Sequence, residues 1–355
     1  MYPKININLQ KITHNAKTIL NQCRKHNIDV FAVTKVTSAD LKVAQAILDG
    51  GITKFADSRI QNIKKLKTNF PNIPVMLLRL PMFSEIEEIV QYCDYILVSE
   101  EKTILELEKY AAIYGKSPKL ILMVDLGDLR EGFWADTLDD FCEITKKITN
   151  CRIDGMGVNL ACYGGVIPTA LKMNDLIFLA KEFQEKTGIT LKTISGGNSS
   201  TLPLVISDEI PFDINNLRIG EAIMLGRNVI NRHPWPDTFQ DTFTFEAQII
   251  ELKEKPSVPQ GLIGQDAFGN TPDYEDRGVH HRAILGAGRQ DIAVDGLIPL
   301  GNYEVLGASS DHIIIDVEKI HSDIKLGDTL EFMLSYGALL QAFTSEYVYK
   351  NYMEE

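Results

Sequence analysis

The chain has few of the features that mark secreted, membrane-spanning or nucleic-acid-binding proteins. Its five cysteines are odd in number and irregularly spaced, which suggests free thiols and a cytoplasmic protein. No apolar run approaches the length needed to cross a bilayer, and no N-terminal stretch resembles a signal peptide. Acidic residues outnumber basic ones by 48 to 36, and the formal charge of −12 argues against binding to nucleic acids or to anionic membranes.

The remaining composition is that of an ordinary globular protein. The chain is 45% hydrophobic and 24% charged, and its 355 residues suffice for two domains or for one barrel with an appendage. Short apolar runs bounded by polar residues predict buried strands, and segments of helical spacing separate them. The predicted strands lie at residues 30–35, 53–56, 74–80, 95–98, 119–124, 152–160, 191–194 and 216–218. The predicted helices lie at residues 9–25, 60–68, 84–93, 102–114, 138–148, 169–186 and 200–206.

Eight strands, each followed by a helix or a helix-like turn, predict an α/β fold with a (β/α)8 TIM-type barrel over residues 8–232. A doubly wound open sheet is the alternative, but it requires neither eight units nor such even spacing. Near Pro234 and Pro236 the pattern changes to short β-rich segments between turn residues. We therefore predict a C-terminal all-β domain over residues 237–355, to which residues 1–7 could add a strand. Its predicted strands lie at residues 242–252, 283–286, 303–306, 313–317 and 329–333, with a loop at 256–282.

Polar side chains follow several predicted strands, at the end where a barrel gathers its chemistry. Lys35 ends the first strand, and a lysine in partly apolar surroundings can form a Schiff base with an aldehyde. The alternative is a solvated lysine at a strand end. Residues 195–200 end the seventh strand with two glycines that allow close approach to an anion, although a serine-capped turn is an equal alternative. With Arg218 ending the eighth strand, the mouth fits a phosphorylated aldehyde.

In their order and spacing these motifs resemble those of the alanine racemase-like (fold type III) enzymes that use pyridoxal 5'-phosphate, most of all the ornithine racemase branch. The resemblance rests on residues 33–35, 56–59, 123–132, 159–168, 195–200, 217–226, 286–291 and 307–317. It implies an amino-acid racemase, an isomerase that interconverts L- and D-ornithine or other basic or small amino acids, in a homodimer with shared active sites. The alternatives are a non-catalytic pyridoxal phosphate-binding or homeostasis protein and a fold type III D-amino-acid aldolase or decarboxylase.

The resemblance also assigns roles to individual residues of the barrel. Lys35 would carry the cofactor as an aldimine and transfer the proton at Cα. Arg130 would lie near the cofactor's phenolic oxygen and the substrate carboxylate, the alternative being an ion pair with Asp125 or Glu131. Arg218 would face the pyridine nitrogen and keep it unprotonated, which favours racemisation over transamination. The other residues expected to bind the cofactor are Asn159, Asn198, Ser199, Gly220 and Glu221.

The second acid or base of the reaction departs from the family pattern. Alanine racemases place a tyrosine in a glycine-tyrosine-alanine-aspartate motif, whereas residues 288–291 here read Gly-Arg-Gln-Asp. Racemisation needs a proton removed on one face and delivered on the other. We choose Tyr347 as the second catalytic residue, with Cys162, Tyr163, His312 or Lys35 on both faces as alternatives.

A basic substrate side chain requires a carboxylate. Asp128, Glu221, Asp291 and Asp311 are candidates, and we select Asp291 and Asp311 by position. His280 and His281 lie in a polar segment without further ligand spacing, so no metal site is predicted.

Overall fold

The computed structural model describes residues 1–271, 273–320 and 323–353. The chain divides into two compact units. We call Gln10–Gln240 the barrel unit, and residues 1–9 together with those from Asp241 onward the β unit.

Eight parallel strands close the barrel in chain order, as predicted. They are β2 (Asp29–Val33), β3 (Phe55–Asp57), β4 (Val75–Leu77), β5 (Tyr95–Val98), β6 (Lys119–Val124), β7 (Arg152–Val158), β8 (Thr193–Ser195) and β9 (Asn216–Ile219). Pairing of β9 with β2 completes the ring. Nearly every strand residue is buried, because side chains fill the interior and helices cover the outside. Phe31, Met76 and Ile121 belong to the core cluster.

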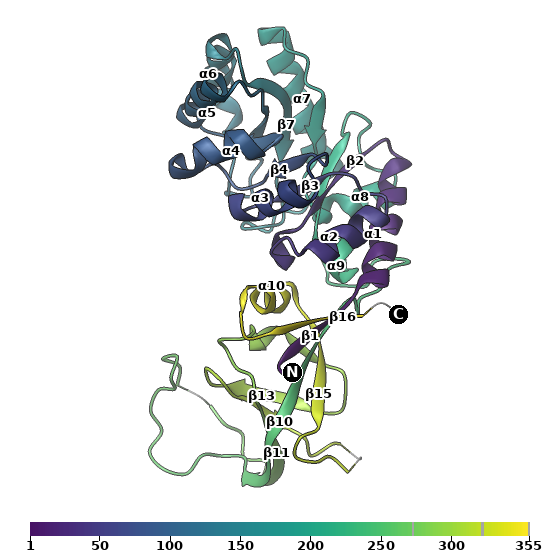
Figure 1. Ribbon diagram of the computed structural model, residues 1–355, viewed down its shortest axis with the longest axis vertical. Coiled ribbons are helices and arrows are strands. Elements are labelled where there is room, and N and C mark those ends of the chain that lie inside the picture. The colour runs from purple at the N-terminus through teal and green to yellow at the C-terminus, as the bar shows by residue number, and fades with distance from the viewer. Residues whose placement is uncertain (272, 321–322, 354–355) are drawn as a thin grey trace. The chain divides into compact units, whose positions relative to one another are not determined.

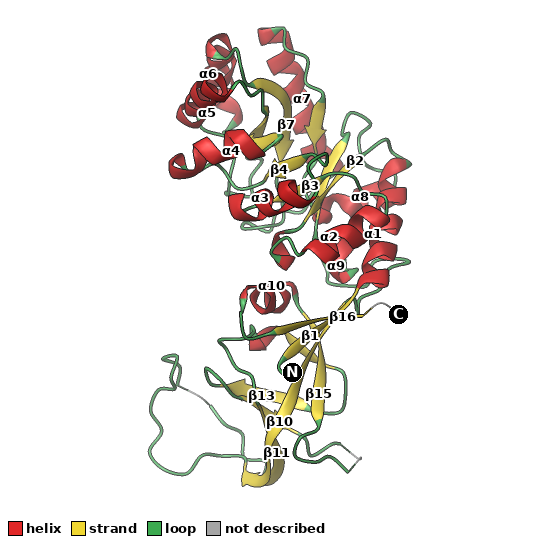
Figure 2. Cartoon of the chain, viewed as in Figure 1, coloured by secondary structure: helices red, strands yellow, loops and turns green. Residues whose placement is uncertain are grey.

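Helices follow the strands and surround them (Figures 1 and 2). They are α1 (Leu9–Arg24), α2 (Leu41–Asp49), α3 (Ile60–Asn69), α4 (Ile86–Tyr92), α5 (Glu101–Tyr114), α6 (Leu138–Ile144), α7 (Ala170–Thr187), α8 (Leu202–Ile206) and α9 (Glu221–Leu225). In α1 the buried residues Ile12, Ala16 and Ile19 recur at helical spacing, so the apolar periodicity of the sequence marks the buried face of this helix. Two single turns of 3-10 helix matter for the site, η1 (Lys35–Thr37) after β2 and η5 (Ser199–Thr201) after β8.

The β unit contains an eight-stranded sheet. Six of its strands pair in the order β12 (Leu297–Pro299), β15 (Thr329–Leu334), β10 (Phe243–Pro256), β11 (Val279–Leu285), β14 (Ile313–Asp316) and β13 (Glu304–Ala308). The first strand, β1 (Lys4–Asn8), pairs antiparallel with β10 and parallel with β16 (Tyr349–Met353), so segments from both ends of the chain meet in one sheet.

The β unit differs from its sequence prediction in four places. The β10–β11 hairpin extends to the pair Pro256 and Val279, beyond the predicted strand ends. Its outer residues are mostly exposed, so ladder hydrogen bonds hold them without an apolar pattern that sequence could reveal. The helix α10 (Tyr336–Thr344) and the strands β12 and β16 were not predicted. The local signals for α10 are Ser335, whose hydroxyl accepts the N–H of Ala338 at 3.3 Å as an N-cap, and buried apolar residues at helical spacing such as Leu339 and Phe343.

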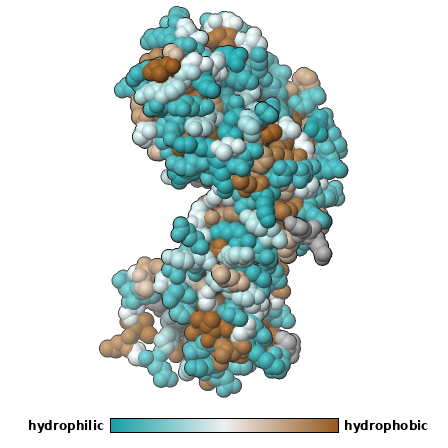
Figure 3. Space-filling model, viewed as in Figure 1, coloured by the Kyte–Doolittle hydropathy of each residue, from teal (hydrophilic) through white to brown (hydrophobic). Residues whose placement is uncertain are grey.

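The surface gives no sign of a lipid-embedded helix. Across the described ranges, each helix is too short or too polar to cross a bilayer. On the face seen in Figure 3, apolar side chains are scattered in small groups among hydrophilic ones.

Candidate active site

Lys35 stands at the mouth of the barrel because it is the second residue after β2, behind Thr34, and opens η1. Its side chain is half-buried. Burial lowers the pKa of the Lys35 amine; negative charge at Cys162 and at Asp57 opposes this shift, and the Arg130 guanidinium adds to it. The lysine is therefore closer to its neutral form than a solvated lysine.

A buried carboxylate lies next to Lys35 at the end of β3. Asp57 is fully buried and accepts hydrogen bonds from Thr34 Oγ1 at 2.7 Å, from Asn62 Nδ2 at 3.0 Å and from the N–H of Arg59 at 3.0 Å. Burial raises the pKa of Asp57, while these donors lower it. The Thr34–Asp57 bond ties the residue before Lys35 to the neighbouring strand, which fixes where the lysine leaves the barrel wall.

The ends of β8 and β9 hold a cation and a set of hydrogen-bond donors. Arg218 is 3% exposed, and its guanidinium donates to Ser195 Oγ and, at 2.8 Å, to the carbonyl of Val158. Burial lowers the pKa of Arg218 to about 10, which leaves it protonated at neutral pH. Ser199 Oγ accepts the N–H of Gly220 at 3.2 Å and that of Ala222 at 3.4 Å. This hydroxyl and these amides form what we call the cradle.

Glycine at the cradle leaves room for a close approach of two strands. A Cβ on Gly220 would lie 3.1 Å from Val33 Cβ, so the absent side chain allows the end of β9 to approach the end of β2. The neighbouring Glu221, expected to bind the cofactor, directs its carboxylate to Arg232 at 2.6 Å.

Polar residues after β6, β7 and β8 meet in one cluster. Asn198 Nδ2 donates to Asn159 Oδ1 at 2.9 Å and to the carbonyl of Leu160 at 2.8 Å. Asn159 Nδ2 donates to Cys162 Sγ at 3.1 Å. Arg130 pairs with Glu131, one of the two partners that the sequence offered, and its guanidinium also faces the Asn159 amide. The structure thus brings together Lys35 and four further predicted residues of the barrel, namely Arg130, Asn159, Asn198 and Arg218, with Ser199 beside them.

Comparison with known proteins identifies the family. The sequence model described as "Alanine racemase, N-terminal domain" matches residues 7–228. The chain belongs to the alanine racemase family. It is 44% identical over 352 residues to an ornithine racemase of Acetoanaerobium sticklandii and 42% identical over 356 residues to a lysine racemase of Thermotoga maritima, with 99% of each chain covered in both cases. An alanine racemase structure from Bartonella henselae, solved with covalently bound pyridoxal phosphate, has the same fold, with a TM-score of 0.74, 19% identity and 99% of both chains covered.

This alanine racemase family member is a pyridoxal phosphate-dependent amino-acid racemase, and its residues fit that cofactor. The half-buried amine of Lys35 is a group that can bind an aldehyde covalently. The cradle supplies one hydroxyl and two backbone N–H groups, which are the donors that a phosphate group accepts from. Arg218, buried and protonated, adds a positive charge at the end of β9.

Sequence reasoning missed the role of Asp128 in this racemase. The residue was a candidate for binding a basic substrate, but it is 1% exposed and its carboxylate accepts backbone N–H groups from Cys162 at 3.2 Å, Tyr163 at 2.9 Å and Val166 at 3.1 Å. It therefore fastens the loop after β7 to the loop after β6. No local pattern could reveal this, because the donors lie 34 to 38 positions along the chain.

Three predicted residues belong to the β unit. Tyr347 is 69% exposed. Asp291 is buried and accepts the N–H of Gly288 at 2.8 Å, and burial raises the pKa of its carboxyl. Asp311 is exposed and pairs with His312 Nδ1 at 2.9 Å. Their roles stay predictions.

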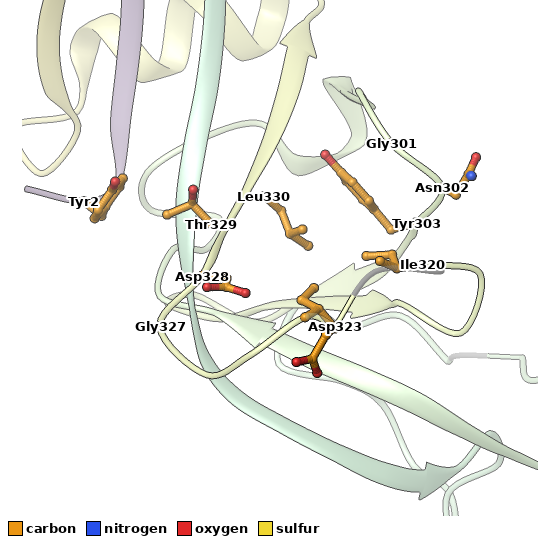
Figure 4. A pocket seen from close by; sticks show the side chains of 11 residues that line it. Tyr2, Gly301, Asn302, Tyr303, Ile320, Asp323, Gly327, Asp328, Thr329 and Leu330 are labelled. Atoms are coloured by element: carbon orange, nitrogen blue, oxygen red, sulfur yellow. The ribbon is translucent and has the colours of Figure 1, made fainter.

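The β unit also contains a hollow of about 750 Å³ (Figure 4). Tyr2, Tyr303, Asp323 and Asp328 lie around it, and no lysine or arginine occurs among its described lining residues. Its two carboxylates do not suit a phosphorylated cofactor. A group of three or more histidine, cysteine or acidic side chains able to hold a metal is also absent from the part of the chain that the structure describes.

Proposed function

We propose that this racemase interconverts L- and D-ornithine, with lysine as the next best substrate. The observation that supports this is the full-length similarity to the ornithine and lysine racemases, at 44% and 42% identity. An alanine racemase of Clostridium tetani is 24% identical, with 92% of this chain covered. The preference is therefore for an α-amino acid with a second, terminal amine.

The barrel residues bind the cofactor and the substrate, and one of them also transfers the proton. When bound, pyridoxal phosphate takes up the electron pair that remains when a proton leaves the α-carbon of an amino acid. Lys35 holds the aldehyde and moves the α-proton with its Nζ. The cradle binds the phosphate through Ser199 Oγ and the amides of Gly220 and Ala222. These amides now donate to Ser199 Oγ, which gathers the three groups in one place. Arg130, with Asn159 beside it, receives the substrate carboxylate.

Arg218 limits the reaction to racemisation. Because its pKa of about 10 keeps it protonated, Arg218 donates hydrogen bonds and cannot take a proton at neutral pH. Arg218 would therefore leave the pyridine nitrogen of a bound cofactor unprotonated, and the cofactor would supply a weaker electron acceptor. That role of Arg218 would favour racemisation over transamination.

The terminal amine of the substrate is positively charged and needs a carboxylate to bind it. In the barrel unit, Asp128 is occupied by backbone N–H groups and Glu221 by Arg232. Asp291 and Asp311 of the β unit also have partners, the N–H of Gly288 and His312, so we assign the amine to these two carboxylates by their position in the sequence. We also assign a homodimer, in which the β unit of one chain completes the barrel site of its partner.

Isotope exchange tests the proposed function. The holoenzyme is incubated in deuterated water with L-ornithine, and optical rotation and α-deuterium are followed by polarimetry and mass spectrometry. We expect rotation to vanish as deuterium enters Cα, fastest for ornithine, then lysine, with alanine slowest. Exchange of alanine alone would overturn the substrate assignment. Cleavage of a β-hydroxy amino acid without racemisation of any amino acid would favour an aldolase.

A further inference from the structure

We propose that the thiol of Cys162 is the second acid/base of the racemisation, acting at the α-carbon from the side of the cradle opposite Lys35. This rests on the proposed function and replaces Tyr347 in that role. The sulfur atom lies within the cluster formed by Asn159 and Asn198, at the barrel mouth.

The strand order places the two groups on either side of the cradle. Lys35 follows β2, and Cys162 follows β7. Between them around the ring lie β9 and β8, since β9 pairs with β2, β8 with β9 and β7 with β8. The residues of the cradle, and Arg218, come from the ends of β8 and β9. A molecule anchored there has the amine on one side and the thiol on the other.

The sulfur is surrounded by groups that fit both of its protonation states. Asn159 Nδ2 donates to Sγ at 3.1 Å, and Asn198 Nδ2 lies 3.5 Å from it, which suits a thiolate. With the Asn159 amide oxygen directed at Arg130 Nη1, 3.2 Å away, the same oxygen also lies beside the sulfur and gives the thiol S–H an acceptor.

The position and exposure of Cys162 suit contact with a substrate. The backbone N–H of Cys162 donates a hydrogen bond to the Asp128 carboxylate at 3.2 Å, and this bond restrains the loop to which the sulfur belongs. It lies near enough to Lys35 and Arg130 for their charges to interact with it. Cys162 is exposed, whereas the four other cysteines are buried.

The proton balance of the step is complete without a further reactant. For one enantiomer, the thiolate takes the α-proton, so the C–H bond breaks, an S–H bond forms and the electron pair passes to the cofactor. The Lys35 ammonium then gives a proton to the opposite face, so an N–H bond breaks and a new C–H bond forms. For the other enantiomer Lys35 takes the proton and the thiol returns one.

The first test compares Cys162→Ala with the unaltered holoenzyme and ornithine in deuterated water. We expect racemisation to fall about 100-fold or more, the usual contribution of a general acid or base. One enantiomer should still exchange its α-hydrogen with retention, through Lys35, and the visible absorbance of the bound cofactor should persist. Ile167→Ala is the matched control, because this residue is 56% exposed on the same loop, and it should racemise normally.

Racemisation by Cys162→Ala at the unaltered rate overturns the inference, and so does loss of exchange from both enantiomers while the cofactor stays bound. Failure of the unaltered enzyme to exchange any amino acid instead overturns the proposed function.

A second test needs no turnover and no variant. Iodoacetamide should alkylate the single exposed thiol of the apoenzyme, and peptide mapping should locate the label at Cys162. In the holoenzyme, saturating L-ornithine should abolish this labelling. Labelling that proceeds equally with and without ornithine overturns the inference.

Discussion

Replacing Asp128 by alanine should loosen the loop that carries Cys162 without unfolding the barrel. The carboxylate accepts three backbone N–H groups of that loop, from Cys162, Tyr163 and Val166. One backbone bond, from the N–H of Gly164 to the Asp128 carbonyl at 3.0 Å, remains in the variant. The loop should therefore stay attached but open more often.

The magnitude follows from the kind of hydrogen bond that is lost. A bond to a charged acceptor contributes about 1.5–3 kcal/mol, so three lost bonds set an upper range of about 5–9 kcal/mol. Cys162 and Tyr163 are exposed, and water can hydrate their freed N–H groups. We therefore expect the loop-opening free energy to fall by about 2–4 kcal/mol, which corresponds to a roughly 30- to 700-fold larger open population.

Hydrogen exchange measures this directly. The amides of Cys162, Tyr163 and Val166 should exchange faster by that factor in Asp128→Ala, while the amides of the barrel strands stay protected. The racemisation rate should also fall, because the thiol is no longer held. Asp139→Ala is the control, since this exposed carboxylate pairs with Lys186 on the surface and its loss should cost at most about 1 kcal/mol. Unchanged exchange at 162–166 in Asp128→Ala would refute the reasoning.

Three further predictions concern the cofactor and the barrel wall. Ser199→Ala should weaken pyridoxal phosphate binding about 10- to 100-fold, because one hydrogen bond to a charged group is lost, and should leave binding of unphosphorylated pyridoxal unchanged in an absorbance titration. Borohydride treatment of the holoenzyme should attach the cofactor to the peptide that contains Lys35, and in Lys35→Ala peptide mass mapping should find no label. Burial raises the pKa of Glu108, but the N–H groups of Cys151, Thr149 and Asn150 outweigh it and hold that pKa at about 2, against an ordinary 4.5. This lowered pKa stabilises the fold by about 3 kcal/mol above pH 5, and the contribution is lost as pH falls towards 2. Urea denaturation across this range should therefore show a loss of stability about 3 kcal/mol smaller in Glu108→Gln than in the native chain.

Sequence alone determined the barrel, and it predicted Lys35 as the nucleophile at the barrel mouth. The strands are buried on both faces, so they read as continuous apolar runs, and the helices between them present apolar residues at helical spacing. Lys35, residues 195–200 and Arg218 could be placed at one mouth because every parallel strand of a closed barrel ends on the same side. That inference needs only the order of elements along the chain.

Only the tertiary structure decided which side chains act together. Asp128 binds donors that are 34 to 38 positions away, and Asn159, Asn198 and Cys162 form one cluster although they follow two different strands. Hydrogen bonds at such separations produce no periodic pattern in the sequence. The spacing of apolar residues indicates only which face of one helix or strand is buried, and it does not indicate which distant residue a side chain bonds to. For the same reason the sequence did not predict the outer part of the β10–β11 hairpin. There, backbone hydrogen bonds join β10 to β11, whose residues lie more than twenty positions further along the chain.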